Sequence, residues 1–339
     1  MGNSKPMKKN GKCELGIAPV PHHSSLITHY SSLITHPPSP FALHRFVLLL
    51  LLAALIAGCS ALRLGYRQAD IILAWRADDY FDLDAQQKHE LDRRLDRLLH
   101  WHRYEQLPEY AAFLGTAVRK AQPGLKREDV AWFVDGFKAR YRIIVDRGAA
   151  DAADLLATLA PEQIVALQKR YDKVNQKFAS ENELDGSVEK RKRARLKKTL
   201  RRIEDWAGSL TREQEQKIAA LLDPIPLIEH LRHADRIRRQ QEFLQLLRLR
   251  ASNREFQPRL QAWLRDWEHG RAPEYEQLSG EVYEKRIQFY LAVDRLLTPG
   301  QRQTALDRLQ EYADDCKALS ERQAEARDMH RVPDRLVFF

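Results

Sequence analysis

The segment that decides the fold reads Leu83-Asp84-Ala85-Gln86-Gln87, and related segments follow at 159–163, 210–214 and 297–301. All four begin with leucine and end with glutamine, and we call this pattern the Leu-x-x-x-Gln motif. Its second residue is aspartate or threonine in three segments and alanine in the segment at 159–163. An aspartate or threonine there can cap the first free N–H groups of a helix, and the glutamine can reach back to the cap residue's own N–H. Each motif therefore predicts the start of a helix.

The rest of the chain favours helices as well. Strand signals are nearly absent, and apolar residues recur at spacings of three and four. Prolines fall between the periodic segments, where they can begin helices. The sequence therefore predicts an all-α fold, an elongated bundle of many helices. The expected helices cover residues 62–77, 85–102, 109–121, 128–159, 161–179, 188–206, 212–222, 227–249, 258–267, 273–297 and 299–329.

A second recurrence points to internal duplication. Trp101 is followed by Pro-Glu-Tyr at 108–110, and Trp267 is followed by Pro-Glu-Tyr at 273–275. Each set lies between two Leu-x-x-x-Gln motifs, although the spacings differ. The order predicts two related helical halves, at 60–185 and 186–330. The alternative is that the motifs are only good helix starts, which any helical protein can use.

An apolar run, FVLLLLLAALIA at 46–57, leads into Gly58, Cys59 and Ser60. The run is shorter than the roughly 20 residues of a membrane-spanning helix and is typical of a signal peptide. Ile-Ala-Gly-Cys at its end resembles the lipobox of bacterial lipoproteins, in which a peptidase cuts before the cysteine and acyl chains such as palmitate are attached to it. The resemblance implies a signal peptide at 43–58 and lipid attachment at Cys59. The alternative is a buried apolar helix with a chance cysteine.

Ser60 bears on the expected location. By resemblance to Gram-negative lipoproteins, aspartate after the cysteine favours the inner membrane and serine favours the outer membrane. The mature chain, 59–339, is therefore expected to be a helical periplasmic domain anchored in the outer membrane. Residues 1–42, with four histidines and two copies of SSLITH, are interpreted as an over-extended gene start or a disordered tail. A His-rich metal-binding tail is the alternative.

Cleavage before Cys59 changes the charge and cysteine arguments. The whole chain has a formal net charge of +9, but residues 1–58 hold five basic residues and one acidic residue. The mature part then carries 51 basic and 46 acidic residues, a net charge of +5, which weakens any argument for nucleic acid from charge alone. Cys316 is left without a partner for a disulfide and is expected to be a small apolar residue in a helix.

The segment EKRKRARLKKTLRR at 189–202 predicts a basic amphipathic helix, with leucines at 196 and 200 on its apolar side. Such a helix can bind an anionic surface: phospholipid, lipopolysaccharide phosphate or an acidic client. The alternative is a solvated face of a bundle helix. A nucleic-acid partner is not expected, because the lipobox resemblance implies export to the envelope. The candidate residues are Lys190, Arg191, Lys192, Arg193, Arg195, Lys197, Lys198, Arg201 and Arg202.

No residues form a recognisable catalytic pattern. The sequence has no P-loop, no H-E-x-x-H, no G-x-S-x-G and no Gly-rich dinucleotide turn. His100 and His102 are expected to be polar residues near a helix end. His230 and His233 could share a metal with Glu229, but a third well-placed ligand is missing. We therefore expect no catalytic residues, no metal and no cofactor.

Two resemblances bear on function. The Leu-x-x-x-Gln motifs resemble those of the LTxxQ-motif periplasmic proteins, which include helical stress chaperones and envelope signalling inhibitors. The mature chain also resembles an uncharacterised family of proteobacterial lipoproteins, catalogued as a domain of unknown function. That resemblance implies an anchored envelope protein without a known activity. It rests on Cys59, Ser60–Tyr66, Trp75, Asp78–Asp82, Trp101–Arg103, Leu107–Tyr110 and the Leu-x-x-x-Gln motifs.

These observations together predict a non-catalytic lipoprotein with a binding or chaperone-like role. Its expected partners are the membrane, through acylated Cys59, and envelope proteins or anionic lipid. The alternative is a scaffolding or assembly lipoprotein that docks onto an envelope complex.

Overall fold

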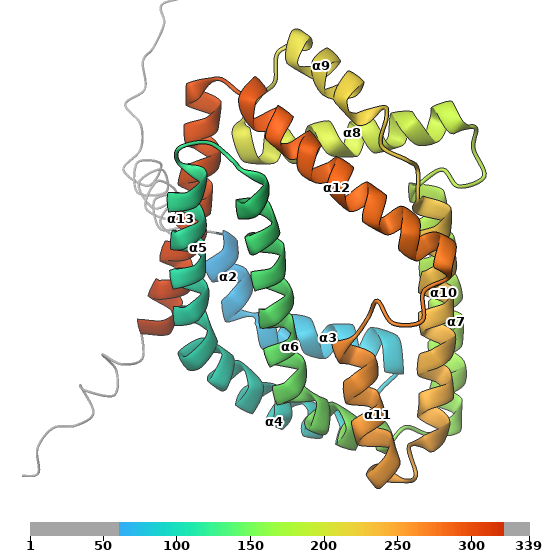
Figure 1. Ribbon diagram of the computed structural model, residues 1–339. Coiled ribbons are helices and arrows are strands. Elements are labelled where there is room, and N and C mark those ends of the chain that lie inside the picture. The colour runs from blue at the N-terminus through green and yellow to red at the C-terminus, as the bar shows by residue number, and fades with distance from the viewer. Residues whose placement is uncertain (1–60, 322–339) are drawn as a thin grey trace, which may run out of the picture. The chain divides into compact units, whose positions relative to one another are not determined.

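The computed structural model describes residues 61–321, which form helices joined by short connections (Figure 1). All described residues belong to one compact unit. Within 61–321 there is no strand, so the all-α prediction is confirmed. The predicted signal peptide and Cys59 lie outside the described residues.

The helices, with their bounds, are α2 (Ala61–Arg67), α3 (Ala69–Phe81), α4 (Ala85–Trp101), the π-helix η1 (His102–Gln106), α5 (Leu107–Ala121), α6 (Arg127–Ala157), α7 (Pro161–Glu181), α8 (Val188–Ala207), α9 (Arg212–Leu222), α10 (Glu229–Leu246), the 3-10 helix η2 (Leu247–Leu249), α11 (Asn253–Arg265), α12 (Pro273–Leu296) and α13 (Pro299–Glu321).

Most predicted helix starts are confirmed, and three details of the prediction are wrong. The helix expected at 62–77 is two helices, because the chain breaks between α2 and α3 at Gln68. The helix expected to begin at Pro258 begins at Asn253, and the buried ring of Phe256 secures the turn before the proline. No loop precedes Pro108, because α4 continues into α5 through η1, where the N–H of Leu107 bonds to the carbonyl of His102.

The Leu-x-x-x-Gln motifs begin α4, α7, α9 and α13, as predicted. At α4, the Asp84 carboxylate accepts from the Gln87 N–H at 2.8 Å, and the Gln87 side chain accepts from the Asp84 N–H at 3.0 Å. The same two bonds are present at the starts of α9 and α13. At α7 only the glutamine bond forms, because Ala160 has no side-chain acceptor.

The four motifs meet in two pairs. Gln87 and Gln163 each donate to the side-chain oxygen of the other, at 3.1 and 2.7 Å. Gln214 and Gln301 do the same at 2.7 and 3.1 Å. Each amide nitrogen also donates to a carbonyl two residues before the partner's cap residue, namely those of Thr158, Asp82, Leu296 and Ser209. One glutamine therefore caps its own helix and holds the start of another.

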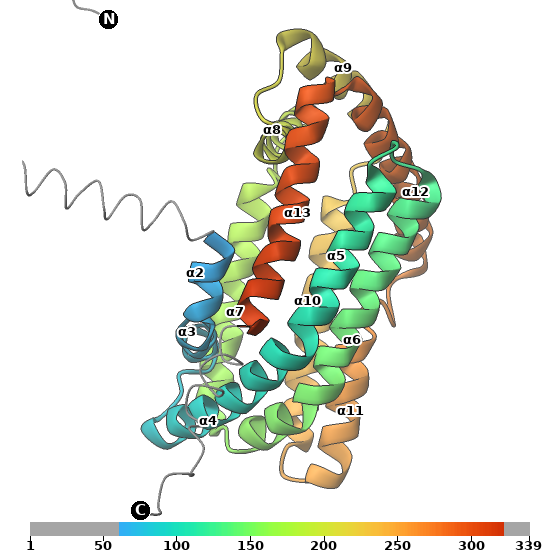
Figure 2. The same ribbon diagram turned by 90° about the vertical axis from the view of Figure 1, so that its left-hand side faces the viewer.

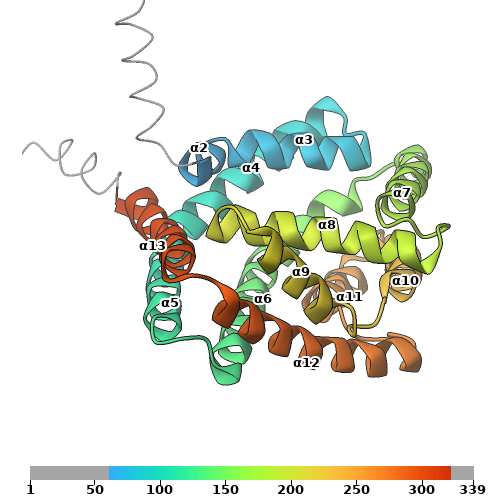
Figure 3. The same ribbon diagram turned by 90° about the horizontal axis from the view of Figure 1, so that it is seen from above.

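The helices pack into three clusters of buried side chains. The first joins α3, α4, α6 and α7 to α10 and α11, and Leu167 and Phe256 are fully buried in it. The second joins α9 and α12, and apolar residues of α8 pack against it. Figure 3 shows α9 between α8 and α12. The third lies where α13 packs along α5 (Figure 2).

The first cluster crosses the predicted boundary between 185 and 186. Phe243 and Leu260, from the second predicted half, pack with Leu91 and Leu156 of the first. The two predicted halves therefore share one core. The paired motifs have the same local geometry in both, whereas the helices between the paired motifs differ in length and partners. Duplication stays a prediction.

Candidate functional site

The predicted anionic-surface residues lie on α8. Leu196, Leu200 and Ile203 pack against the second cluster, so the opposite side of α8 faces outward. Six of the nine basic residues are exposed, and they are Lys190, Arg193, Lys197, Lys198, Arg201 and Arg202. Lys190, Arg193, Lys197 and Arg201 are spaced by three or four residues, which places them on one side of the helix. We call these four residues the basic face.

Within residues 61–321, side-chain hydrogen bonds or ion pairs join three of the nine residues to other parts of the protein. Lys192 forms an ion pair with Asp223 at 2.7 Å. Arg195 donates to the carbonyls of Leu222 and Ile225 at 3.1 and 2.6 Å, which satisfies acceptors at the end of α9. Burial lowers the pKa of the Arg195 guanidinium. Lys198 donates to the carbonyl of Glu181 at 2.6 Å. Arg195 in particular has a structural role that the sequence pattern did not reveal.

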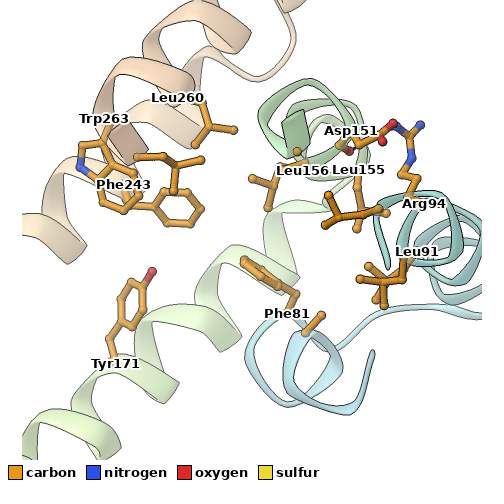
Figure 4. Close-up of a pocket in the computed structure, with 16 residues that line it drawn as sticks. Phe81, Leu91, Arg94, Asp151, Leu155, Leu156, Tyr171, Phe243, Leu260 and Trp263 are labelled. Atoms are coloured by element: carbon orange, nitrogen blue, oxygen red, sulfur yellow. Dashed lines mark hydrogen bonds and ion pairs between the residues drawn. The ribbon is translucent and has the colours of Figure 1, made fainter. Parts of the chain in front are cut away.

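A cavity of about 360 Å³ opens among α3, α4, α6, α7, α10 and α11 (Figure 4). No motif predicted it. Its volume lies in the range of small-molecule sites, and almost all of its wall is apolar. The lining residues are Ala77, Phe81, Leu91, Arg94, Leu95, Leu98, Gly148, Asp151, Ala152, Leu155, Leu156, Tyr171, Phe243, Leu260, Trp263 and Leu264.

Aromatic rings form one side of the cavity. Phe243 lies between Phe81 and Trp263, with ring centroids 6.4 and 5.1 Å away. Two contacts hold the Trp263 ring in place. Its indole N–H donates to Glu242 at 3.1 Å, and the Arg239 guanidinium lies 3.9 Å from the ring centroid. A ring that is already held would lose less entropy if a ligand bound.

Three side chains of the lining carry titratable groups, namely Arg94, Asp151 and Tyr171. Arg94 pairs with Asp151 at 2.8 Å, with Asp154 at 3.3 Å and with Glu90 at 2.6 Å, so its charge is balanced. The Tyr171 hydroxyl points into the cavity (Figure 4). Burial raises the pKa of Tyr171, which keeps its hydroxyl neutral. The cavity therefore offers apolar contact and one hydroxyl, and its lining holds no nucleophile paired with a base.

A polar cluster surrounds η1. The Tyr66 hydroxyl and His102 Nδ1 are 2.9 Å apart, and the two rings stack. Burial lowers the pKa of His102, so its ring is neutral at pH 7, and burial raises the pKa of Tyr66 to about 12. Cys316 is buried in α13, as predicted, and burial raises the pKa of its thiol to about 11. The cysteine is therefore a poor nucleophile.

The possible metal site at Glu229, His230 and His233 gains no further ligand in the described part of the chain. Among residues 61–321, no three His, Cys, Asp or Glu side chains are placed to hold a metal ion. The His233 ring instead stacks on Phe178, with centroids 5.6 Å apart and planes 6° apart. Across the same residues, no helix combines the length and the apolar character needed to cross a membrane.

Comparison with known proteins gives a family and no activity. No curated protein and no solved structure matches the chain. A family described as "Family of unknown function (DUF6279)" matches residues 79–276, which is more than half of the 339 residues. The matched region contains the basic face, the pair formed by Gln87 and Gln163, and every residue that lines the cavity except Ala77. The chain therefore belongs to the DUF6279 family, whose function is unknown.

Proposed function

We propose that this protein is a non-catalytic lipoprotein of the bacterial envelope that binds apolar side chains of client proteins. The observation that carries the binding role is the cavity of about 360 Å³ with its aromatic wall. The envelope location rests on the lipobox-like residues that end at Cys59 and on Ser60. The resemblance of the Leu-x-x-x-Gln motifs to those of LTxxQ-motif proteins supports a chaperone-like role.

The chemistry of the cavity favours apolar groups over charged ligands. Transfer of an apolar group into it gains about 0.8 kcal/mol for each buried CH₂. A charged ligand would lose its hydration and find Arg94 and Asp151 already paired with each other. The Tyr171 hydroxyl can donate one hydrogen bond, for example to a backbone carbonyl of an extended segment. Leucine or phenylalanine side chains of an unfolded client suit these conditions.

Filling the cavity should abolish this binding. Ala152 lines the cavity on α6, and Ala152→Phe places a ring in the space. We expect the affinity for a neutral apolar probe, N-phenylnaphthylamine, to fall at least about tenfold, a loss of about 1.4 kcal/mol. Fluorescence titration measures the affinity, and light scattering of a denatured client measures suppression of aggregation.

Ala150→Phe is the matched control for that experiment. Ala150 lies on the same helix, but it is exposed and does not line the cavity. We expect this variant to bind the probe and the client as the wild type does. If Ala152→Phe, folded by circular dichroism, keeps the wild-type affinity, the cavity is not the binding site.

The basic face of α8 favours a second role, in which the protein docks onto an anionic envelope surface. This role is the anionic-surface binding that the segment at 189–202 predicts. Lys197→Glu with Arg201→Glu should weaken binding to phosphatidylglycerol vesicles roughly 30-fold, because each basic residue near such a surface contributes about 1 kcal/mol. The measurement is vesicle co-sedimentation of the protein that begins at Ser60, which lacks both the apolar run at 46–57 and Cys59.

Lys169→Glu with Lys173→Glu is the matched pair on α7. Both residues are exposed and, like 197 and 201, lie four residues apart. We expect this pair to change vesicle binding only slightly. Equal losses from the two pairs would mean that net charge, and not the basic face, attracts the vesicles.

A further inference from the structure

The helix α3 has an apolar surface that the described protein leaves uncovered. The helix contains Ile71, Ile72, Leu73 and Trp75, yet none of its residues is buried. Ile71 is 66% exposed and Trp75 is 60% exposed, the two largest values among the exposed large hydrophobic residues of α3. Single apolar residues on a surface need no explanation, but a group of them on one short helix does.

Three of these residues share one side of α3. Ile71, Ile72 and Trp75 fall within about a third of the helix circumference, at 100° per residue, and we call them the α3 apolar face. Asp70 points elsewhere and lines a small cavity with Tyr66 and His100. Ala74, Ala77 and Tyr80 pack against the first cluster, so the side of α3 that carries them is turned to the body of the protein and the α3 apolar face is turned away from it. Figure 3 shows α3 along the outer edge of the helices, beside α4.

We propose that the α3 apolar face inserts into the interfacial layer of the lipid bilayer that holds the N-terminal anchor. The inference rests on the proposed envelope anchoring. It adds a contact between the folded body and the lipid, and thereby a defined orientation of the body on the membrane.

The position of α3 in the chain supports a bilayer as the occupant. The apolar run at 46–57 ends just before α2, and Cys59 precedes Ala61 by two residues. Under the proposed anchoring the chain enters α2 from lipid, either through acylated Cys59 or through the attached apolar run. Seven residues of α2 add about 10 Å, and the residues around it add at most about 7 Å on each side. The start of α3 therefore lies within about 25 Å of the anchor.

The chemistry of α3 fits the bilayer interface. Tryptophan is enriched at the boundary between water and hydrocarbon, and basic residues beside it contact lipid phosphates. The Arg76 guanidinium lies 5.5 Å from the centroid of the Trp75 ring, and Arg67 is exposed on α2. A helix that lies in the plane of the interface buries its apolar side about 5–10 Å into the headgroup region. A weak contact suffices here because the anchor already holds the protein at the surface.

The orientation of α2 is fixed by the body. Arg63 in α2 forms an ion pair with Asp315 in α13, with Nε and Oδ1 2.5 Å apart, and Asp315 is 0% exposed. Leu62 and Tyr66 pack against the third cluster. The chain that leads from the anchor to α3 is therefore tied to α13, so contact of the α3 apolar face with lipid would position the whole body.

Quenching of tryptophan fluorescence by brominated lipid tests the proposal. The full-length acylated protein is reconstituted in phosphatidylcholine–phosphatidylglycerol vesicles, with and without bromine on the upper acyl carbons. We expect bromine to quench part of the wild-type emission and the quenched part to fall about threefold or more in Trp75→Phe. Trp132→Phe is the control, because Trp132 lies on α6 and packs against Phe113, with ring centroids 4.7 Å apart, and its loss should leave the quenched part unchanged.

The outcomes separate this inference from the proposed function. Mass spectrometry of Cys59 and flotation of the protein with vesicles report on the anchor. If the protein is acylated and floats, but Trp75→Phe is quenched as strongly as the wild type, the α3 contact is wrong and the anchoring stands. Chemical cross-linking tests whether a second copy covers the α3 apolar face. If bromine does not quench Trp75 and two copies cross-link through α3, a second copy covers this face and the proposal is overturned. If the protein is neither acylated nor membrane-bound, both proposals fail.

Discussion

Gln87→Ala should lower the free energy of unfolding by about 3 kcal/mol, although it changes one uncharged side chain at the start of a helix. Gln87 is 5% exposed and bonds to Asp84, Thr158 and Gln163. Each hydrogen bond contributes about 1 kcal/mol, and each buried partner left unsatisfied costs about 1–3 kcal/mol. Urea denaturation followed by circular dichroism measures the loss.

The neighbouring glutamine provides the control. Gln86 is exposed, and we expect Gln86→Ala to change stability by less than about 0.5 kcal/mol. A double-mutant cycle then tests the pairing itself. Gln87→Ala and Gln163→Ala should be non-additive because the two side chains bond to each other, whereas Gln87→Ala and Gln301→Ala should be additive because they belong to different pairs. Additivity in both cycles would contradict the paired arrangement.

Arg63→Met should destabilise the protein by about 3 kcal/mol and loosen α2 from α13. Asp315 is fully buried, close in sequence to Cys316 and Leu319 of the third cluster. Removal of the Arg63 guanidinium 2.5 Å away takes an opposite charge from a carboxylate that water does not reach. Loss of one partner of a buried ion pair typically costs about 3–5 kcal/mol, and we take the lower value because Arg63 is itself partly exposed. Thermal unfolding measures the global effect, and hydrogen exchange of α2 measures the local one.

Arg67→Met is the control that shows whether the loss in Arg63→Met comes from the ion pair or from the removal of any positive charge on α2. Arg67 lies one turn later on α2 and is exposed, so we expect little change in stability. The double variant Arg63→Met with Asp315→Leu should regain much of the loss, because paired apolar side chains can replace a buried ion pair. A large loss in Arg67→Met, or no recovery in the double variant, would contradict this explanation.

Periodicity and capping predicted most of the helices because both are local. The start of α9 depends on Thr211 and Gln214, three residues apart, and the bonds between them form as expected. The predicted helix boundaries were wrong where contacts between distant residues, or a π turn, determine the path of the chain. Phe256 packs in the first cluster and extends α11 in front of Pro258, and the π turn of η1 carries the chain past the expected break before Pro108.

In the candidate site too, local features were predictable from the sequence and features that depend on tertiary contacts were not. The basic face on α8 was predictable because the spacing of basic and apolar residues determines the sides of a helix. The role of Arg195 was not, since it depends on carbonyls at the end of α9. The cavity was not predictable either. Phe81, Phe243 and Trp263 occupy apolar positions on three helices, and nothing local shows that the helices leave a space between them.

The sequence by itself determined that this protein is all-α, where most of its helices begin, and that α8 carries a basic face. These properties depend on residues within one or two turns of each other. Only the tertiary structure decided which Leu-x-x-x-Gln motifs pair, where the cavity lies and that α2 is tied to α13. Those contacts join residues 76, 87 and 252 positions apart in the chain, and their geometry depends on how whole helices pack.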